Sequence, residues 1–219
     1  MDKKIHVLLL EDHALISLGV EVMLRETYKE SLTFKVVTDA DTALDYLQRH
    51  TVDILLLDLI LKSEHPTKLK SGDELLRDIY LWERKPKTII LSKIDSLDVL
   101  NYCIEQLEAD AYILKSKTSV DEIIPAIDAV LENEYYYSYT IRKLLKYQFG
   151  LLEMDTTDRI ILKELSNGLH QKEIVLVLEK KEINISVSAV EKRIRKLKIK
   201  FEANTTSHLV GIAIRKGII

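Results

Sequence analysis

The chain has 219 residues, of which 47% are hydrophobic and 31% are charged, and its formal net charge is −3. This composition is typical of a globular protein with enough apolar material for one large domain or two modest ones. The apolar runs are only a few residues long, far short of the roughly 18 that cross a bilayer, so we expect no membrane segment.

The opening stretch MDKKIHVLLLED has too brief an apolar part for a secretory signal, and we interpret it as a first strand. Cys103 is the single cysteine, so no internal disulfide can form, which is consistent with a reducing compartment. We therefore expect a cytoplasmic protein.

The first 132 residues alternate between short apolar runs and segments with helical spacing. The runs predict strands, and the spacing predicts helices between them. Five strands alternating with five helices predict an α/β fold with a doubly wound, five-stranded parallel sheet, covered on both faces. The expected strands are 5–10, 34–38, 54–57, 88–91 and 111–114, and the expected helices are 13–26, 41–49, 73–82, 97–107 and 120–132.

Polar side chains follow four of these strands. Functional groups of a doubly wound sheet gather beyond the carboxyl ends of its strands, so we expect these side chains to converge. Three clustered carboxylates suit Mg²⁺, and an aspartate can accept a phosphoryl group as a nucleophile. A hydroxyl and an ammonium group could contact phosphoryl oxygens. The five residues are Glu11, Asp12, Asp58, Ser92 and Lys115.

Taken singly, these residues also have structural interpretations. Asp12 and Asp73 could cap the helices that follow them, and Lys115 could be a solvated surface lysine. Charged clusters can also be purely structural. The placement of all five groups after the right strands favours the functional interpretation.

Residues 133–153 contain no proline and one glycine, which predicts an ordered connector rather than a flexible linker. For its tyrosines, Tyr135–Tyr137 and Tyr139, we expect a packing surface between domains, with nucleic-acid stacking as the alternative. Residues 1–150 hold 26 acidic and 19 basic residues, a net of −7, while residues 151–219 hold 9 and 13, a net of +4. This asymmetry hints at an acidic domain joined to a basic one that faces nucleic acid.

The last part of the chain is helical throughout in its pattern. Asp155, Thr156 or Thr157 offers an N-cap, and Gly168 suits a helix stop. Three or four short helices with a basic third one predict a small all-α helix-turn-helix domain. The expected helices are 157–167, 171–178, 186–201 and 207–215.

The third of these helices has an apolar stripe that faces a core and basic residues on its other faces. At 3.6 residues per turn, Ser188, Lys192, Arg195 and Ile199 are expected to point away from the core, and such a helix fits the DNA major groove. A solvated lysine face or a protein-docking face is the alternative for this helix alone. RNA binding is a weaker alternative, because no aromatic platform is visible. The stripe consists of Val190, Ile194, Leu197 and Phe201.

Residues 1–132 resemble the receiver domain of two-component response regulators, a flavodoxin-like fold. The resemblance is carried by the acidic pair, the aspartate after the third strand, the serine after the fourth and the stretch YILK. It implies that a cognate histidine kinase phosphorylates Asp58. It also implies that Ser92 and Lys115 contact the phosphoryl group and that Ser92 and Tyr112 reorient as a switch. The implied Mg²⁺ ligands are Asp12 and Asp58, with Glu11 close by and the backbone carbonyl of Ile60.

Three features depart from the receiver pattern. Lys93 stands where the family usually has a small residue, so phosphoryl donors could be slowed or the product shielded. The loop Lys62–Gly72, KSEHPTKLKSG, is longer than usual and basic, and the stretch from Ser92 to Lys115 is slightly long. These departures bear on rates and partner preference rather than on the class.

Residues 154–219 resemble the NarL/LuxR-type output domain, through NGLHQKEI (167–174), ISVSAV (185–190) and the segment from Phe201 to Val210. The resemblance implies binding to double-stranded DNA. Base contacts are implied for Glu191, Lys192 and Arg195, beside the outward Ser188, and phosphate contacts for Arg193 and Lys196.

This region also departs from its family. Glu191 replaces a usual lysine, which could change the preferred DNA sequence or weaken binding, and Thr206 replaces an arginine. The segment LEKKEINIS adds about five residues before the recognition helix, and we expect a small wing or a longer scaffold helix.

The sequence therefore predicts a receiver at 1–132, a connector at 133–153 and a helix-turn-helix domain at 154–219. Together they predict a phosphorylation-regulated transcriptional regulator rather than an enzyme, which forms a homodimer at least when phosphorylated. One alternative is a pseudo-receiver that binds DNA regardless of phosphorylation. Another is a Mg²⁺-dependent phosphohydrolase, although no second acid follows Asp58 closely.

Overall fold

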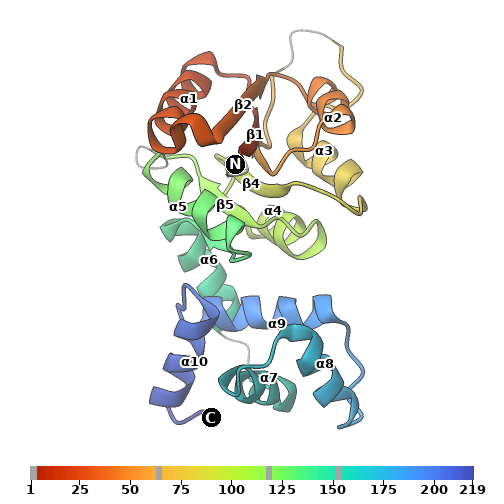
Figure 1. Ribbon diagram of the computed structural model, residues 1–219, viewed down its shortest axis with the longest axis vertical. Helices are drawn as coiled ribbons and strands as arrows, with labels where there is room; N and C mark the ends of the chain where they lie inside the picture. The colour runs from red at the N-terminus through yellow and green to blue at the C-terminus, as the bar shows by residue number, and fades with distance from the viewer. Residues whose placement is uncertain (1–3, 63–65, 117–119, 151–153) are drawn as a thin grey trace. The chain divides into compact units, whose positions relative to one another are not determined.

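A computed structural model describes residues 4–62, 66–116, 120–150 and 154–219, with the side chains of 146–150 excepted. Contacts divide the chain into two compact units, Met1–Ile141 and Arg142–Ile219 (Figure 1). Each unit is described by itself. In the described part of the chain, no helix combines the length and the apolar character that a membrane span requires.

The first unit alternates strands and helices as the sequence predicts. The expected helix 97–107 is present, but its second half widens into a π-helical turn. The elements are β1 (Ile5–Leu10), α1 (Ala14–Tyr28), η1 (Lys29–Ser31), β2 (Leu32–Val37), α2 (Ala40–Arg49), β3 (Ile54–Asp58), α3 (Gly72–Ile79), β4 (Lys87–Ser92), α4 (Leu97–Asn101), η2 (Tyr102–Gln106), β5 (Ala111–Leu114), α5 (Val120–Leu131) and β6 (Tyr136–Tyr137). The boundary between the two units falls within α6 (Tyr139–Gly150), after Ile141.

The strands form one parallel sheet in the order β2-β1-β3-β4-β5-β6. The prediction of five strands was wrong by one, because β6 adds to the edge of β5, with Tyr136 beside Ala111 and Tyr137 beside Tyr112. Two tyrosines of the expected connector therefore belong to the sheet of the first unit. Tyr136 also donates a hydrogen bond from its hydroxyl to Glu122 Oε2 at 3.0 Å.

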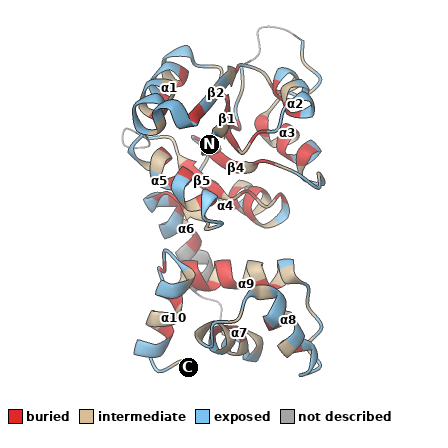
Figure 2. Cartoon of the chain, viewed as in Figure 1, coloured by how far each residue is buried: buried red, intermediate tan, exposed pale blue. Residues whose placement is uncertain are grey.

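Alternate strand residues face opposite layers of helices. Val7, Leu9, Ile54 and Leu56 pack with α1 and α5 on one face, and α2, α3 and α4 lie against the other (Figure 1). The strand β3 is buried over its whole length and its neighbours β1 and β4 are buried except at their first residues, whereas the helices keep an exposed side (Figure 2). This is the burial that short, continuously apolar strands predict.

The second unit is a small helical domain. Asp155 is the N-cap of the first helix in a capping box with Asp158, and Gly168, with φ +84°, follows the end of that helix. Both boundaries agree with the sequence. The apolar stripe of α9 contributes Val190, Ile194 and Leu197 to the core. The helices are α7 (Thr156–Ser166), α8 (Gln171–Glu179), α9 (Val187–Lys200) and α10 (Thr206–Arg215).

The extra residues before α9 form neither a wing nor a longer α8. They lengthen the turn itself, which runs from residue 180 to residue 186 within the fully described range 154–219. Ile183 N donates to Leu178 O at 3.0 Å, and Glu182 has a left-handed backbone with φ +62°. Ile183 and Ile185 pack against the core of the helical unit. These two contacts hold the long turn against the domain.

Candidate functional site

The strand register brings the predicted acceptor residues to one edge of the sheet. Asp58 is the last residue of β3 and pairs with Leu91, and Ser92 is the last of β4 and pairs with Leu114. Glu11 directly follows β1, and Lys115 directly follows β5. All four lie at carboxyl ends of neighbouring parallel strands, as the sequence predicts.

Lys115 joins two of the acids. Its Nζ donates hydrogen bonds to Glu11 Oε2 and to Asp58 Oδ2, each at 2.6 Å. The Glu11 side chain is fully buried, and those of Asp58 and Lys115 are 7% and 10% exposed. Two carboxylates in so little water need a cation beside them, and Lys115 supplies one. Lys115 is therefore not the solvated surface lysine of the structural interpretation.

Lys115→Met should destabilise the protein by roughly 3 kcal/mol, because two buried carboxylates lose their shared cation. The measurement is urea unfolding at neutral pH, and added Mg²⁺ should recover part of the loss. Lys87→Met is the matched control, since Lys87 Nζ pairs with Asp110 at 3.1 Å but is 38% exposed, and its loss should be under about 1 kcal/mol. Equal effects of the two changes would contradict the bridging role.

Asp12 lies at the same edge without capping a helix. Its Oδ2 accepts from Lys62 N at 2.8 Å, and its Oδ1 lies 2.8 Å from His13 Nδ1. Burial opposes ionisation here, but the Lys62 amide and the His13 side chain together lower the pKa of Asp12. Asp12 is therefore charged throughout the neutral range. The N-cap of α1 is His13 instead, which makes no side-chain cap bond.

His13 is a member of the site that our sequence interpretation missed, although its position next to the acidic pair was a signal. Its backbone N–H donates to Glu11 Oε1 at 3.1 Å. Ligand atoms of Glu11, Asp12 and His13 all lie within 4.8 Å of one another. The carboxylates of Glu11 and Asp12 offer the hard oxygen ligands that Mg²⁺ prefers, so these donors fit this ion. The His13 imidazole lies beside the two carboxylates.

Asp58 is held by its own chain as well as by Lys115. Its Oδ1 accepts from Ile60 N at 3.0 Å. Its backbone carbonyl lies against Gly72, at the start of α3, and a Cβ added at that glycine would overlap the carbonyl oxygen. The backbone carbonyl of Ile60 as a metal ligand stays a prediction.

Ser92 and Tyr112 meet at the segment after β4. The fully buried Tyr112 donates from its hydroxyl to Ile94 O at 2.7 Å, and Ser92 Oγ accepts from Ile94 N at 3.2 Å. Burial raises the pKa of Tyr112, so its hydroxyl stays protonated and can donate. Both groups implied as a switch thus hold one residue between them. Lys93, just before it, is exposed.

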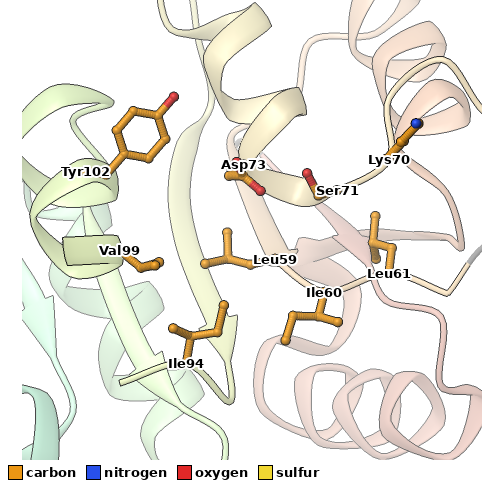
Figure 3. A pocket seen from close by; sticks show the side chains of 9 residues that line it. All are labelled: Leu59, Ile60, Leu61, Lys70, Ser71, Asp73, Ile94, Val99 and Tyr102. Atoms are coloured by element: carbon orange, nitrogen blue, oxygen red, sulfur yellow. The ribbon is translucent and has the colours of Figure 1, made fainter. Parts of the chain in front are cut away.

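Ile94 also lines a cleft of about 330 Å³, together with residues that follow Asp58 at the end of β3 (Figure 3). The segments after β3 and β4 face each other across it, together with the start of α3 and the helix α4. Its walls are mainly apolar, with a polar rim at the start of α3. The lining residues are Leu59, Ile60, Leu61, Lys70, Ser71, Asp73, Ile94, Val99 and Tyr102.

Acidic side chains fix the described part of the long loop Lys62–Gly72, whose residues 63–65 lie outside the described residues. Asp41, in the first turn of α2, accepts from Lys68 N at 2.7 Å and from Leu69 N at 3.0 Å. These two amides lower the pKa of Asp41. Glu74 accepts from Lys70 N at 2.8 Å. The described part of the loop is therefore held by hydrogen bonds from its backbone, and its lysines, Lys62, Lys68 and Lys70, are exposed.

In the helical unit, the predicted outward face of α9 is only partly outward. Ser188 is exposed, and Glu191, Lys192 and Lys196 are half-buried. The expectation for Arg195 and Ile199 was wrong, because they are 1% and 8% exposed. Lys198 is buried too, so α9 has a second buried stripe at positions 195, 198 and 199 besides its core stripe. A helical wheel drawn for one helix cannot predict this second stripe.

Arg193 makes two ion pairs with the first turn of α7. Its Nη1 donates to Asp155 Oδ2 at 2.8 Å and to Asp158 Oδ1 at 2.7 Å. Burial alone would lower the pKa of Arg193, but the hydrogen bonds that it donates to Asp158 and Asp155 raise it. The sequence analysis assigned Arg193 to a DNA phosphate and did not foresee these partners, which lie 35 and 38 residues away in the chain.

Comparison with known proteins gives a consistent picture of both units. A family model described as the response regulator receiver domain matches residues 7–128. The nitrate/nitrite response regulator protein NarP of Escherichia coli is 29% identical over 199 residues, which are 87% of this chain and 86% of that protein. The transcriptional regulatory protein YdfI of Bacillus subtilis is 25% identical over 221 residues, 97% of each chain.

Solved structures resemble the fold over nearly the whole length. The RcsB response regulator of Salmonella typhimurium aligns with a TM-score of 0.58 at 16% identity, covering 97% of this chain and 99% of its own. An RcsB–DNA complex aligns with a TM-score of 0.57 at 17% identity, covering 97% and 98%. These likenesses show the combination of a receiver fold with a helical output fold.

Proposed function

This chain belongs to the response regulator receiver domain family, and from that premise we propose that it is a DNA-binding transcriptional regulator controlled by phosphorylation. The observation that carries the proposal is the edge where Lys115 Nζ bridges Asp58 and Glu11, with Asp12 beside them. A buried carboxylate held by a cation at a strand end is suited to accept a phosphoryl group.

The proposed roles follow from that geometry. Asp58 Oδ2 attacks the phosphorus of a donor, for which we propose the phosphohistidine of a cognate kinase; the new O–P bond forms as the P–N bond breaks, and the kinase imidazole leaves. Glu11, Asp12, Asp58 and the Ile60 carbonyl would hold Mg²⁺, which would supply positive charge beside the phosphoryl oxygens. Lys115 moves from pairing two carboxylates to pairing a phosphoryl oxygen, and Ser92 donates a hydrogen bond to another.

We further propose that phosphorylation alters the Ser92–Ile94–Tyr112 contacts and promotes a homodimer that binds paired half-sites on double-stranded DNA in the cytoplasm. RcsB dimers bound to DNA support the DNA part of this proposal by likeness of fold. Ser188, Glu191 and Lys192 are the proposed base-facing residues, with Lys196 beside the phosphates. Arg195 is buried, so it could contact a base only after a structural change that exposes its side chain.

The test is DNA binding before and after phosphorylation. A duplex is selected from a random pool with the wild-type protein, and its affinity and the oligomeric state are measured with Mg²⁺, with and without a small phosphodonor. We expect tighter, salt-dependent binding and a larger oligomer with the donor. Binding that ignores the donor would favour a pseudo-receiver, and no duplex binding at all would overturn the proposal. Sustained hydrolysis of phosphate esters would favour the phosphohydrolase alternative.

A further inference from the structure

The ion pairs of Arg193 share their acids with a helix cap. Asp155 Oδ1 accepts from Asp158 N at 2.8 Å, and Asp158 Oδ2 accepts from Asp155 N at 3.3 Å. The other oxygen of each carboxylate accepts from Arg193 Nη1. Every carboxylate oxygen of the pair therefore has a donor. Capping of α7 and attachment of α9 form one network.

This network restricts what the guanidinium can do. To reach a DNA phosphate, Arg193 would have to leave two carboxylates that are 51% and 15% exposed, and it would leave two adjacent anions behind. Those anions would repel the same phosphate. The residue is therefore poorly placed to supply the favourable electrostatic contact that our sequence analysis assigned to it.

The position of Arg193 on the helix gives it a different use. Val190 and Ile194 face the core, while Ser188 and Lys192 lie on the opposite side at 3.6 residues per turn. Arg193 lies on the flank between these two sides. An apolar stripe alone lets a helix rotate by small angles about its own axis, whereas a lateral ion pair at the flank fixes that rotation.

We propose that Arg193 is a positioning residue: by tying α9 to the first turn of α7, it sets the direction in which Ser188 and Lys192 are presented to DNA bases, and it contacts no DNA phosphate itself. The inference rests on the proposed DNA-binding function and deepens it. The shifted pKa values of Arg193 and Asp155, raised and lowered respectively, agree with a persistent pair, although burial opposes both shifts.

The experiment uses the full-length protein, the selected duplex and a scrambled duplex of the same composition. Affinities are measured across a salt series for wild type, Arg193→Gln, Asp158→Asn and the double variant. Lys163→Gln and Glu179→Gln are the matched controls, because both are exposed, lie on α7 and α8, and lose the same charges. Arg193→Lys and the milder Asp155→Asn keep the test usable if a variant folds poorly, which thermal unfolding reports.

If Arg193 positions α9, Arg193→Gln and Asp158→Asn each weaken binding to the selected duplex about tenfold. This is about the effect of losing one base contact. The double variant is then no worse than either single one, Arg193→Lys recovers part of the affinity, and the salt slope stays that of wild type. The scrambled duplex changes only as the controls do. Loss of discrimination with an unchanged slope is the signature of a positioning role.

Three results would overturn the inference. A salt slope smaller by about one for Arg193→Gln, with tighter binding by Asp158→Asn, would make Arg193 a phosphate contact. A lower melting temperature with unchanged discrimination would make the pair merely structural. If the wild type binds no duplex, the proposed function fails, and this inference fails with it; if it binds but the variants match their controls, the inference alone fails.

Discussion

Asp58→Ala is expected to remove phosphoryl acceptance completely. The wild-type protein, incubated with Mg²⁺ and a small phosphodonor, should gain one phosphoryl group in its intact mass, and the variant should gain none. The reason is chemical, because Asp58 is a strand-end carboxylate beside the Lys115 ammonium at 2.6 Å, and Glu11, the other partner of Lys115, has a fully buried side chain whereas that of Asp58 is 7% exposed. Regulated DNA binding should be lost together with the adduct.

The control for this experiment is Asp45→Ala, which removes an aspartate that is 63% exposed and pairs with Arg49 four residues on. It should keep the adduct. An adduct that persists in Asp58→Ala would place the acceptor elsewhere. Absence of an adduct in the wild type with every donor would indicate a pseudo-receiver, with the exposed Lys93 as the first candidate for the obstruction.

Gly72→Ala is expected to have a large effect on stability. The new Cβ would overlap the Asp58 carbonyl oxygen and press on the Leu57 side chain, so β3 or α3 must shift. Overpacking typically costs about 1–3 kcal/mol, and because the overlap is with backbone we expect a loss at the upper end of that range, which urea unfolding would measure. The displaced strand end should also slow phosphoryl acceptance, which intact mass against time would record.

Gly19→Ala is a matched control of opposite sign. Gly19 lies within α1, and an added Cβ there meets no atom within 4 Å. Alanine favours a helix over glycine by about 1 kcal/mol, so this variant should be more stable than the wild type. A Gly72→Ala protein that is as stable as Gly19→Ala would show that α3 does not begin against Asp58.

Strands, strand ends and helix caps that depend on short stretches of sequence could be predicted from the sequence. Continuous apolar runs identified β1, β3, β4 and β5, and the rule on strand ends brought Asp58, Ser92 and Lys115 to one edge. The Asp155 cap and the Gly168 stop were also predictable, because capping depends on neighbours three or four residues away.

The rest depends on what one element meets in another. Two adjacent tyrosines are too short a stretch to show the alternating pattern of a strand, so the sequence does not predict β6. This strand is defined by its pairing with the edge of β5. Burial of Arg195 and the partners of Arg193 are set by other elements, which a wheel of α9 alone does not contain. The length of the turn before α9 could be recognised as unusual from the sequence. The hydrogen bond from Ile183 N to Leu178 O that closes this turn could not be predicted from it.

The two-residue strand β6 has a consequence for how this protein behaves in a crowded solution. A sheet edge with unpaired amides is a template on which another chain can add a strand and begin an aggregate. Beyond the end of β6, Ser138 satisfies two backbone groups of β5. Its N–H donates to Tyr112 O at 3.0 Å, and its Oγ accepts from Leu114 N at 3.1 Å. At this edge, opposite the one formed by β2, the sheet thus ends on a strand too short to nucleate further growth.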